Sequence, residues 1–319
     1  MMENVAPGPD SPILRVALIG SLTVERGAVT LDGSALGGPK PRQILEILLL
    51  NLGIPVSKHR LIDLLWGANP PREALTSIES YVSVLRRRLQ PGHGRSGPLR
   101  TTTGGYVLDP GQVDLDLSRF EGLLRQARGR DAAESYPLLV EALALATGPL
   151  LGDELRPAWA EEERHRHSVD VTVARVLAAE AAHEIRRFDE AARWAREAVT
   201  ADPLNERAWT ALVLGLESAG RPAEGLRAYA ECRDVLDRAL GCEPSAMLRG
   251  VHRRLLLATA SSGGDLSEAV SALLVLHDRL QRKAGADADA ALQLDGPMDV
   301  VRQAAQVLRS LLRRVPEAA

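Results

Sequence analysis

The chain has 319 residues, of which 45% are hydrophobic, and it carries 39 basic and 42 acidic residues. This length can bury a substantial core and form two or three domains. The start, MMENVAPGPDSP, lacks the basic beginning and apolar core of a signal peptide. No apolar run approaches the roughly 18 residues that a membrane span needs. We therefore expect a cytoplasmic protein with no membrane partner, in which residues 1–12 form a disordered leader.

Charge is divided unevenly along the chain. From Ala35 to Leu108 there are 10 basic and 4 acidic residues, which leaves 29 basic and 38 acidic residues elsewhere. A basic segment supplies the salt-sensitive, non-specific part of affinity for nucleic acid, whereas an acidic remainder limits indiscriminate binding to polyanions. The pattern favours a nucleic-acid-binding module joined to a module of another kind.

Short β-branched segments and two helices open the folded part of the chain, which we expect to begin at Ile13. ILRVALIG, SLTVER and AVTLDG predict three small strands. A first helix is predicted over about 41–51, and it is apolar almost all round, as expected for a central buried helix. A second is predicted over about 57–66, with Ser57 as its N-cap. Its predicted buried residues are Leu61, Leu64 and Leu65.

A third helix, beyond Pro70 and Pro71, has one apolar and one polar face. Apolar residues recur at steps of three and four, which predicts a stripe facing the core. That stripe consists of Leu75, Ile78, Val82, Leu85 and Leu89. At 100° per residue the opposite side carries Thr76, Ser77, Ser80, Val84 and Arg87, with Tyr81, Ser83 and Arg88 on its flanks. Hydroxyls can contact base edges or phosphates and guanidiniums can clamp phosphates, so this face suits a DNA groove better than an ordinary solvated one.

The segments LRTTT and YVLD, around Gly104 and Gly105, predict a β-hairpin after the third helix. Three helices followed by such a hairpin are the order of a winged helix-turn-helix. The sequence therefore predicts a winged domain over residues 13–110, with the hairpin as its wing.

After Asp109 the composition changes to long Ala/Leu/Arg/Glu helices, expected from near Leu117 to about Thr259 with no β structure among them. Two segments repeat at a spacing of 34, the tetratricopeptide period, since Arg187 aligns with Arg221 and Glu190 with Glu224. Further packing positions fall at Pro203, Trp209, Leu212, Gly225, Tyr229 and Cys232. The fold class predicted for the whole chain is mainly α with a small β component, a winged helix-turn-helix followed by a tetratricopeptide-like helical array.

The strings GGPKPRQILEILLLN, VSKHRLIDLLWG, YVSVLRRRL, GPLLGD, WAEEERHR and GRPAEGLRAYAECRDVLDRALGCEPSAMLR give the chain a specific resemblance. Over residues 13–260 it resembles the Streptomyces antibiotic regulatory protein (SARP) family of transcriptional activators. The resemblance implies a response-regulator-type winged domain followed by a bacterial transcriptional activation domain over residues 111–260. It also implies a homodimer on direct repeats in double-stranded DNA, at promoters of secondary-metabolite genes, and recruitment of RNA polymerase holoenzyme.

The family's DNA contacts carry over mainly to the third helix. They place at the groove Thr76, Ser77, Ser80, Tyr81, Ser83, Val84 and Arg87, with Arg86 on phosphate. In the wing, many relatives have an arginine where this chain has Thr102, which weakens the expectation of minor-groove binding. Strand alternation puts Arg100 on the same side as Thr102, and Thr103 completes the predicted set. The residues before Ile13 carry no phosphoacceptor aspartate pattern of a receiver domain, so we do not expect control by the usual response-regulator phosphorylation.

Other functional classes have weaker support. The acid and histidine cluster EEERHRH lacks the HExxH spacing of a zinc protease, and Gly37 does not open a phosphate loop. Cys232 and Cys242, ten apart, lack the spacing of a zinc site. We expect no enzymatic activity, catalytic residue, metal or cofactor. The alternative to a DNA-binding activator is a tetratricopeptide adaptor whose winged domain contacts protein.

Residues 261–319 form a C-terminal extension with two predicted helices, about 266–283 and 298–314. The first has an amphipathic pattern. Two roles are open for these helices: they cap the end of the helical array, or they mediate dimerisation or regulation.

Overall fold

The computed structural model describes residues 14–92, 97–154 and 158–260. The predicted leader and the C-terminal extension lie outside the described residues, so their predictions stay as they are. The chain divides between Ala178 and Ala179 into two compact units. No helix of the described part is long and apolar enough to cross a membrane.

A four-stranded sheet opens the first unit. The predicted strands β1 (Leu14–Ala17), β2 (Thr23–Arg26) and β3 (Val29–Asp32) pair antiparallel, and β7 (Val113–Leu115) lies parallel to β1 in the order β3-β2-β1-β7. Strand β7 is only three residues long, which is too short for a recognisable alternating pattern. It lies before Leu117, where the predicted helices begin, and the sequence pattern did not predict it. The boundary at 110 stays a prediction, although two strands on either side of it share one sheet.

Three helices follow as predicted: α1 (Pro39–Leu50), α2 (Lys58–Trp66) and α3 (Ala74–Leu89). Most of α1 is buried, because α2 and α3 pack against it. The Ser57 hydroxyl accepts a hydrogen bond from the Arg60 backbone N–H at 3.1 Å and caps α2. Leu61 and Leu65 are buried, but Leu64 is only half-buried, because it lies at the margin of the inward face.

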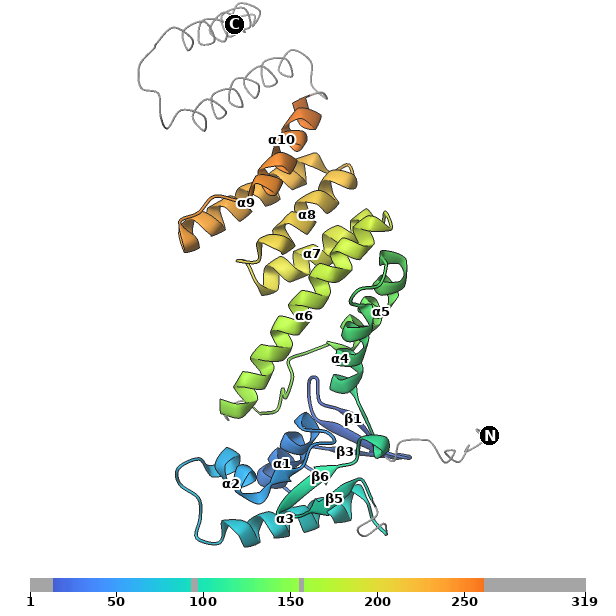
Figure 1. Ribbon diagram of the computed structural model, residues 1–319, viewed down its shortest axis with the longest axis vertical. Helices are drawn as coiled ribbons and strands as arrows, with labels where there is room; N and C mark the ends of the chain where they lie inside the picture. The colour runs from blue at the N-terminus through green and yellow to red at the C-terminus, as the bar shows by residue number, and fades with distance from the viewer. Residues whose placement is uncertain (1–13, 93–96, 155–157, 261–319) are drawn as a thin grey trace, which may run out of the picture. The chain divides into compact units, whose positions relative to one another are not determined.

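The wing is a second, three-stranded sheet beside α3 (Figure 1). It contains β4 (Val56–Ser57), β5 (Leu99–Thr102) and β6 (Gly105–Leu108) in the order β4-β6-β5. A Cβ on Gly105 would lie 2.2 Å from the Val56 carbonyl oxygen, so only glycine allows β4 to pair there. The predicted hairpin and winged helix-turn-helix are confirmed.

Helices complete the first unit. A 3₁₀ turn, η1 (Pro110–Gln112), leads through β7 to α4 (Asp116–Ala127), α5 (Ala132–Leu145) and the first part of α6 (Ala158–Glu184). The Asp116 carboxylate accepts hydrogen bonds from the backbone N–H groups of Leu18 and Ile19 at 2.9 to 3.0 Å. The start of α4 is therefore tied to the end of β1.

The second unit contains the end of α6 together with α7 (Phe188–Ala201), α8 (Glu206–Ser218), α9 (Pro222–Leu240) and α10 (Ala246–Ala260). Helices α7 and α9 begin 34 residues apart, as the repeat predicted. Trp209, Leu212, Tyr229 and Cys232 are buried, and Trp209 Nε1 donates to the Pro203 carbonyl at 2.9 Å. The mainly helical, tetratricopeptide-like fold class is confirmed.

Candidate nucleic-acid interface

The inward face of α3 holds the helix against the winged core. Ile78, Val82, Leu85 and Leu89 are at most 1% exposed. Leu75, predicted to belong to this stripe, is 46% exposed, so that prediction was wrong. The helix begins at Ala74, which occupies the buried side of the first turn and turns Leu75 toward solvent.

The outward face of α3 is a polar stripe of Thr76, Ser80, Ser83 and Arg87, all exposed and spaced by four, three and four residues. The Ser83 hydroxyl donates to the Glu79 carbonyl at 2.8 Å, so its lone pairs remain as acceptors. Glu79 is held by Lys58 at 2.5 Å, which reduces the negative charge at the edge of the stripe. We call these four residues the polar stripe.

The other predicted groove residues on α3 are Ser77, Tyr81 and Val84, which are half-buried. Val84 packs closely on the loop before α1, since a Cβ on Gly37 would lie 2.5 Å from Val84 Cγ1. Val84 therefore helps to set the position of α3, whichever other contacts it makes.

Arg86 joins α3 to the wing. Its Nε donates to the Leu99 carbonyl at 3.2 Å and its Nη2 to the Thr101 hydroxyl at 2.6 Å. The guanidinium lies 5.9 Å from the centre of the Tyr106 ring. The family resemblance implied a phosphate contact for Arg86, and in the structure Arg86 also holds the wing to α3. Thr101, which the sequence patterns did not single out, is part of that link.

The predicted wing residues differ in exposure. Arg100 forms an ion pair with Asp109 at 2.5 Å, which occupies part of its guanidinium. Thr102 is half-buried, and its hydroxyl has no hydrogen-bond partner within the described part of the chain. Thr103 is exposed at the hairpin tip. Polar groups open to solvent are thus more numerous on α3 than on this wing.

Arg87 and Arg88 are exposed at the end of α3, where the helix dipole favours cations. The Arg88 backbone carbonyl accepts a hydrogen bond from Arg26 of β2, a residue that no sequence pattern singled out. This link fixes the end of α3 against the first sheet. The arginines at the end of α3 therefore lie on a part of the helix that is held in place by the first sheet.

A carboxylate cluster connects α1 with the segment after α5. Arg42 donates from Nε and Nη2 to Glu154 Oε1 at 2.8 and 2.5 Å, and Gln43 donates to Glu154 Oε2 at 2.8 Å. Glu46 is fully buried, 3.7 Å from Arg42, and accepts no hydrogen bond from any described residue. Burial, together with neighbouring Glu154 and Asp153, raises the pKa of Glu46 to about 8 against the opposing effect of Arg42.

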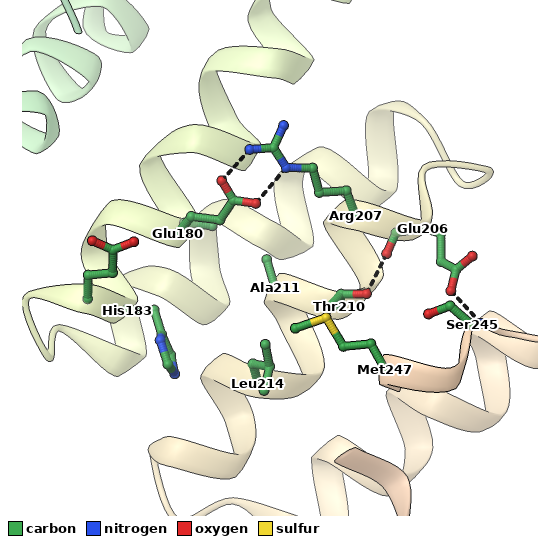
Figure 2. A pocket seen from close by; sticks show the side chains of 11 residues that line it. Glu180, His183, Glu206, Arg207, Thr210, Ala211, Leu214, Ser245 and Met247 are labelled. Carbon is green, nitrogen blue, oxygen red and sulfur yellow. Dashed lines mark hydrogen bonds and ion pairs between the residues drawn. The ribbon is translucent and has the colours of Figure 1, made fainter. Parts of the chain in front are cut away.

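The second unit has a cavity of about 500 Å³ on the face formed by α6, α8 and the start of α10. Figure 2 shows its side chains, with Glu180 and Arg207 paired through two hydrogen bonds of 2.6 Å. Glu206 accepts from the Ser245 backbone N–H at 2.6 Å, and Met247 is exposed at the rim. An apolar rim and several carboxylates are features of a protein-binding surface. The described residues contain no group of three or more His, Cys, Asp or Glu side chains that could hold a metal.

Comparisons with known proteins agree with both parts of the fold. Two family models match the chain, "Transcriptional regulatory protein, C terminal" over residues 34–108 and "Bacterial transcriptional activator domain" over residues 115–256. The transcriptional regulator RedD of Streptomyces coelicolor is 32% identical, over 72% of this chain and 69% of RedD. The regulatory protein AfsR of the same organism is 32% identical over 78% of this chain, which spans only 25% of AfsR.

One solved structure is similar over 96% of this chain and 73% of its own, with a TM-score of 0.67 and 25% identity. It is Mycobacterium tuberculosis EmbR in complex with a low-affinity phosphopeptide.

Proposed function

The chain belongs to the SARP family of transcriptional regulators, and we propose that it activates transcription by holding promoter DNA through the polar stripe of α3. The family consists of regulators and not of enzymes. The observation that carries the proposal is the exposed set Thr76, Ser80, Ser83 and Arg87 on a helix whose other side is buried. Such a helix can enter the major groove with hydroxyls at base edges and arginine at phosphate.

The predicted contact residues have different roles in the proposed complex with DNA. Ser80 and Tyr81 would distinguish bases, Arg87 would hold phosphate, and Thr103 would touch the backbone from the wing. Arg86 would act mainly by supporting the wing, because two of its donors already bind β5.

Directly repeated half-sites, occupied side by side by two copies of the chain, are the proposed target. The promoters would belong to secondary-metabolite genes, as in antibiotic pathways, and the protein would act in the cytoplasm, where the chromosome lies. The cavity of the second unit supplies the surface for RNA polymerase holoenzyme, because its apolar rim and carboxylates suit a partner segment with apolar and basic residues.

Selection of bound duplexes from a random library tests the target directly. The expected product is a pair of direct repeats, and selection without any enriched sequence would contradict specific binding. With the selected duplex, Arg87→Ala should weaken binding to all sequences and reduce the salt slope by about 1. Ser80→Ala should relax the preference at one position of each half-site, at a cost of about 1 to 3 kcal/mol.

Arg227→Ala is the matched control, since Arg227 is an exposed arginine of α9 in the second unit. It should leave DNA affinity and its salt dependence unchanged. Affinity that responds neither to salt nor to Arg87→Ala would favour the adaptor function, in which the winged domain binds protein.

A further inference from the structure

A second cavity, of about 530 Å³, lies within the first unit and has no part in the function proposed above. One wall is the loop of residues 146–150, which comes after α5. The other is α6, where Arg164, His165, Ser168 and Arg175 succeed one another at helical spacing and therefore share a face. Glu161 is the single acidic residue of the lining. Cationic and neutral donors thus outnumber carboxylates around the space.

His167 adds a buried polar group to the same lining. Its side chain belongs to a residue that is only 4% exposed, and its Nε2 has no hydrogen-bond partner among the residues that the structure describes. The ring lies edge-on to Phe120, with centroids 4.9 Å apart and planes at 68°. A buried polar atom left without a partner costs about 1 to 3 kcal/mol. An occupant of the cavity that hydrogen-bonds to His167, after a rotation of the ring that exposes Nε2, would remove this cost.

Burial lowers the pKa of His167, against a weaker opposing effect of Asp170. The imidazole is therefore neutral near pH 7, with one donor and one acceptor nitrogen. The positive charge of the cavity then comes from its arginines. Arg164 Nη1 donates to the Leu151 and Glu154 carbonyls, which orients a guanidinium that has five N–H donors in all.

We propose that this cavity binds a small organic molecule carrying a carboxylate or phosphate group. Planar guanidiniums match both groups in geometry and charge, and Ser168 and His167 supply neutral hydrogen bonds. A volume of about 530 Å³ is in the range of pockets for metabolite-sized ligands and is larger than a bare phosphate ion needs.

The position of the cavity connects it with the DNA-binding fold. Its wall residues Pro149 and Leu150 pair with the turn after β1, where the Gly20 N–H donates to the Pro149 carbonyl at 2.9 Å and Ile19 pairs with Leu150. A bound anion would therefore touch the segment that holds the first sheet in place.

Isothermal titration of the full chain with citrate, glycerol 3-phosphate and adenosine monophosphate tests the proposal and separates carboxylate from phosphate ligands. We expect at least one of them to bind at one site per chain. Arg175→Gln and, separately, His167→Phe should weaken that binding by about tenfold or more. Phenylalanine keeps the ring volume beside Phe120 and removes both nitrogens.

Arg166→Gln is the matched control. Arg166 directly precedes His167 on α6, but it pairs with Glu163 at 2.8 Å and does not line the cavity. Its substitution should therefore leave binding unchanged. The ¹⁵N chemical shifts of the His167 ring should move when the ligand is added, which a remote binding site would not cause. No binding of the three anions at millimolar concentration would overturn the proposal. Binding that survives both Arg175→Gln and His167→Phe in folded protein would overturn it equally.

Discussion

The guanidinium of Arg42 donates two hydrogen bonds to a single carboxylate oxygen of Glu154, a residue 112 positions further along the chain. Glu154 is buried, and Gln43 occupies its second oxygen. The first helix of the winged domain is thereby fixed to the segment that leads into α6. Glu154 loses almost all of its hydration and Arg42 most of it, since their side chains are 4% and 22% exposed, so each depends on the other.

Glu154→Ala should destabilise the first unit by about 3 to 5 kcal/mol, because it leaves Arg42 largely buried without its principal acceptor. Denaturant unfolding followed by circular dichroism measures this change. Glu25→Ala is the control, since Glu25 pairs with Arg15 at 3.6 Å and both side chains are about half exposed or more. That control should change stability by less than about 1 kcal/mol. Equal effects of the two substitutions would show that the Arg42–Glu154 pair contributes no more to the free energy of unfolding than the exposed Arg15–Glu25 pair.

Glu46 should make the stability of the protein depend on pH. Its pKa is about 8 in the folded state, against 4.5 as the ordinary value. Between these two values the folded state keeps a proton that the unfolded state has released, so stability falls as pH rises from about 4.5 to about 8. Glu46→Gln removes this ionisation and should raise stability at pH 8 by about 3 to 5 kcal/mol, since each unit of pKa difference corresponds to about 1.4 kcal/mol.

Unfolding curves of the parent protein and of Glu46→Gln, collected from pH 5 to pH 9, provide the measurement. The two proteins should be similar in stability near pH 5 and diverge as pH rises. Parallel pH profiles would mean that Glu46 titrates as an ordinary carboxyl group.

Gly37→Ala should disturb the placement of α3. Gly37 has φ of +99°, and a Cβ there would lie 2.5 Å from Val84 Cγ1. We expect a loss of about 1 to 3 kcal/mol in stability and a clear loss of DNA affinity. Gly38→Ala is a close control, because φ is +105° and no atom lies within 4 Å of its Cβ.

The double substitution Gly37→Ala with Val84→Ala should recover part of the lost stability, since the smaller side chain makes room for the added methyl group. Identical behaviour of Gly37→Ala and Gly38→Ala would show that backbone strain, and not contact with α3, is the whole effect.

Truncation should reveal how strongly the winged domain depends on the rest of the first unit. A fragment of residues 1–110 loses β7, the Asp116 carboxylate and Glu154, all of which contact the winged domain. We expect its thermal midpoint to be lower than that of a fragment of residues 1–178 by about 10 °C or more, because it loses these three contacts at about 1 to 3 kcal/mol each. Equal midpoints would show that the winged domain folds independently.

Local features of the fold could be predicted from the sequence, because their causes lie within a few residues of one another. Ser57 caps α2 through a residue three positions later, and the apolar spacing of Ile78 and Val82 identifies the buried side of α3. The 34-residue period is likewise visible in the sequence, because the two repeats follow one another along the chain. Leu75 was misassigned because periodicity does not tell where the core ends at the first turn of a helix.

Long-range partners could not be predicted. The family resemblance assigned Arg86 to a phosphate, and only the folded chain brings Thr101 and the Leu99 carbonyl to it. Glu46 sits among apolar residues in the sequence, but the charges that shift its pKa come from Glu154 and Asp153, far along the chain. The sequence around His167 has the pattern of a solvated helix, and only the fold brings Phe120 against its ring.

The pairing of β1 with β7 limits where recombination between related genes can join the two domains without loss of contacts. The two family models meet between residues 108 and 115, next to a strand that is hydrogen-bonded to the N-terminal sheet. A crossover between relatives at that point would pair a β1 from one parent with a β7, an Asp116 and a Glu154 from the other. We expect chimaeras joined after residue 178 to inherit intact partners, and those joined near 110 to need matched substitutions on both sides of the junction.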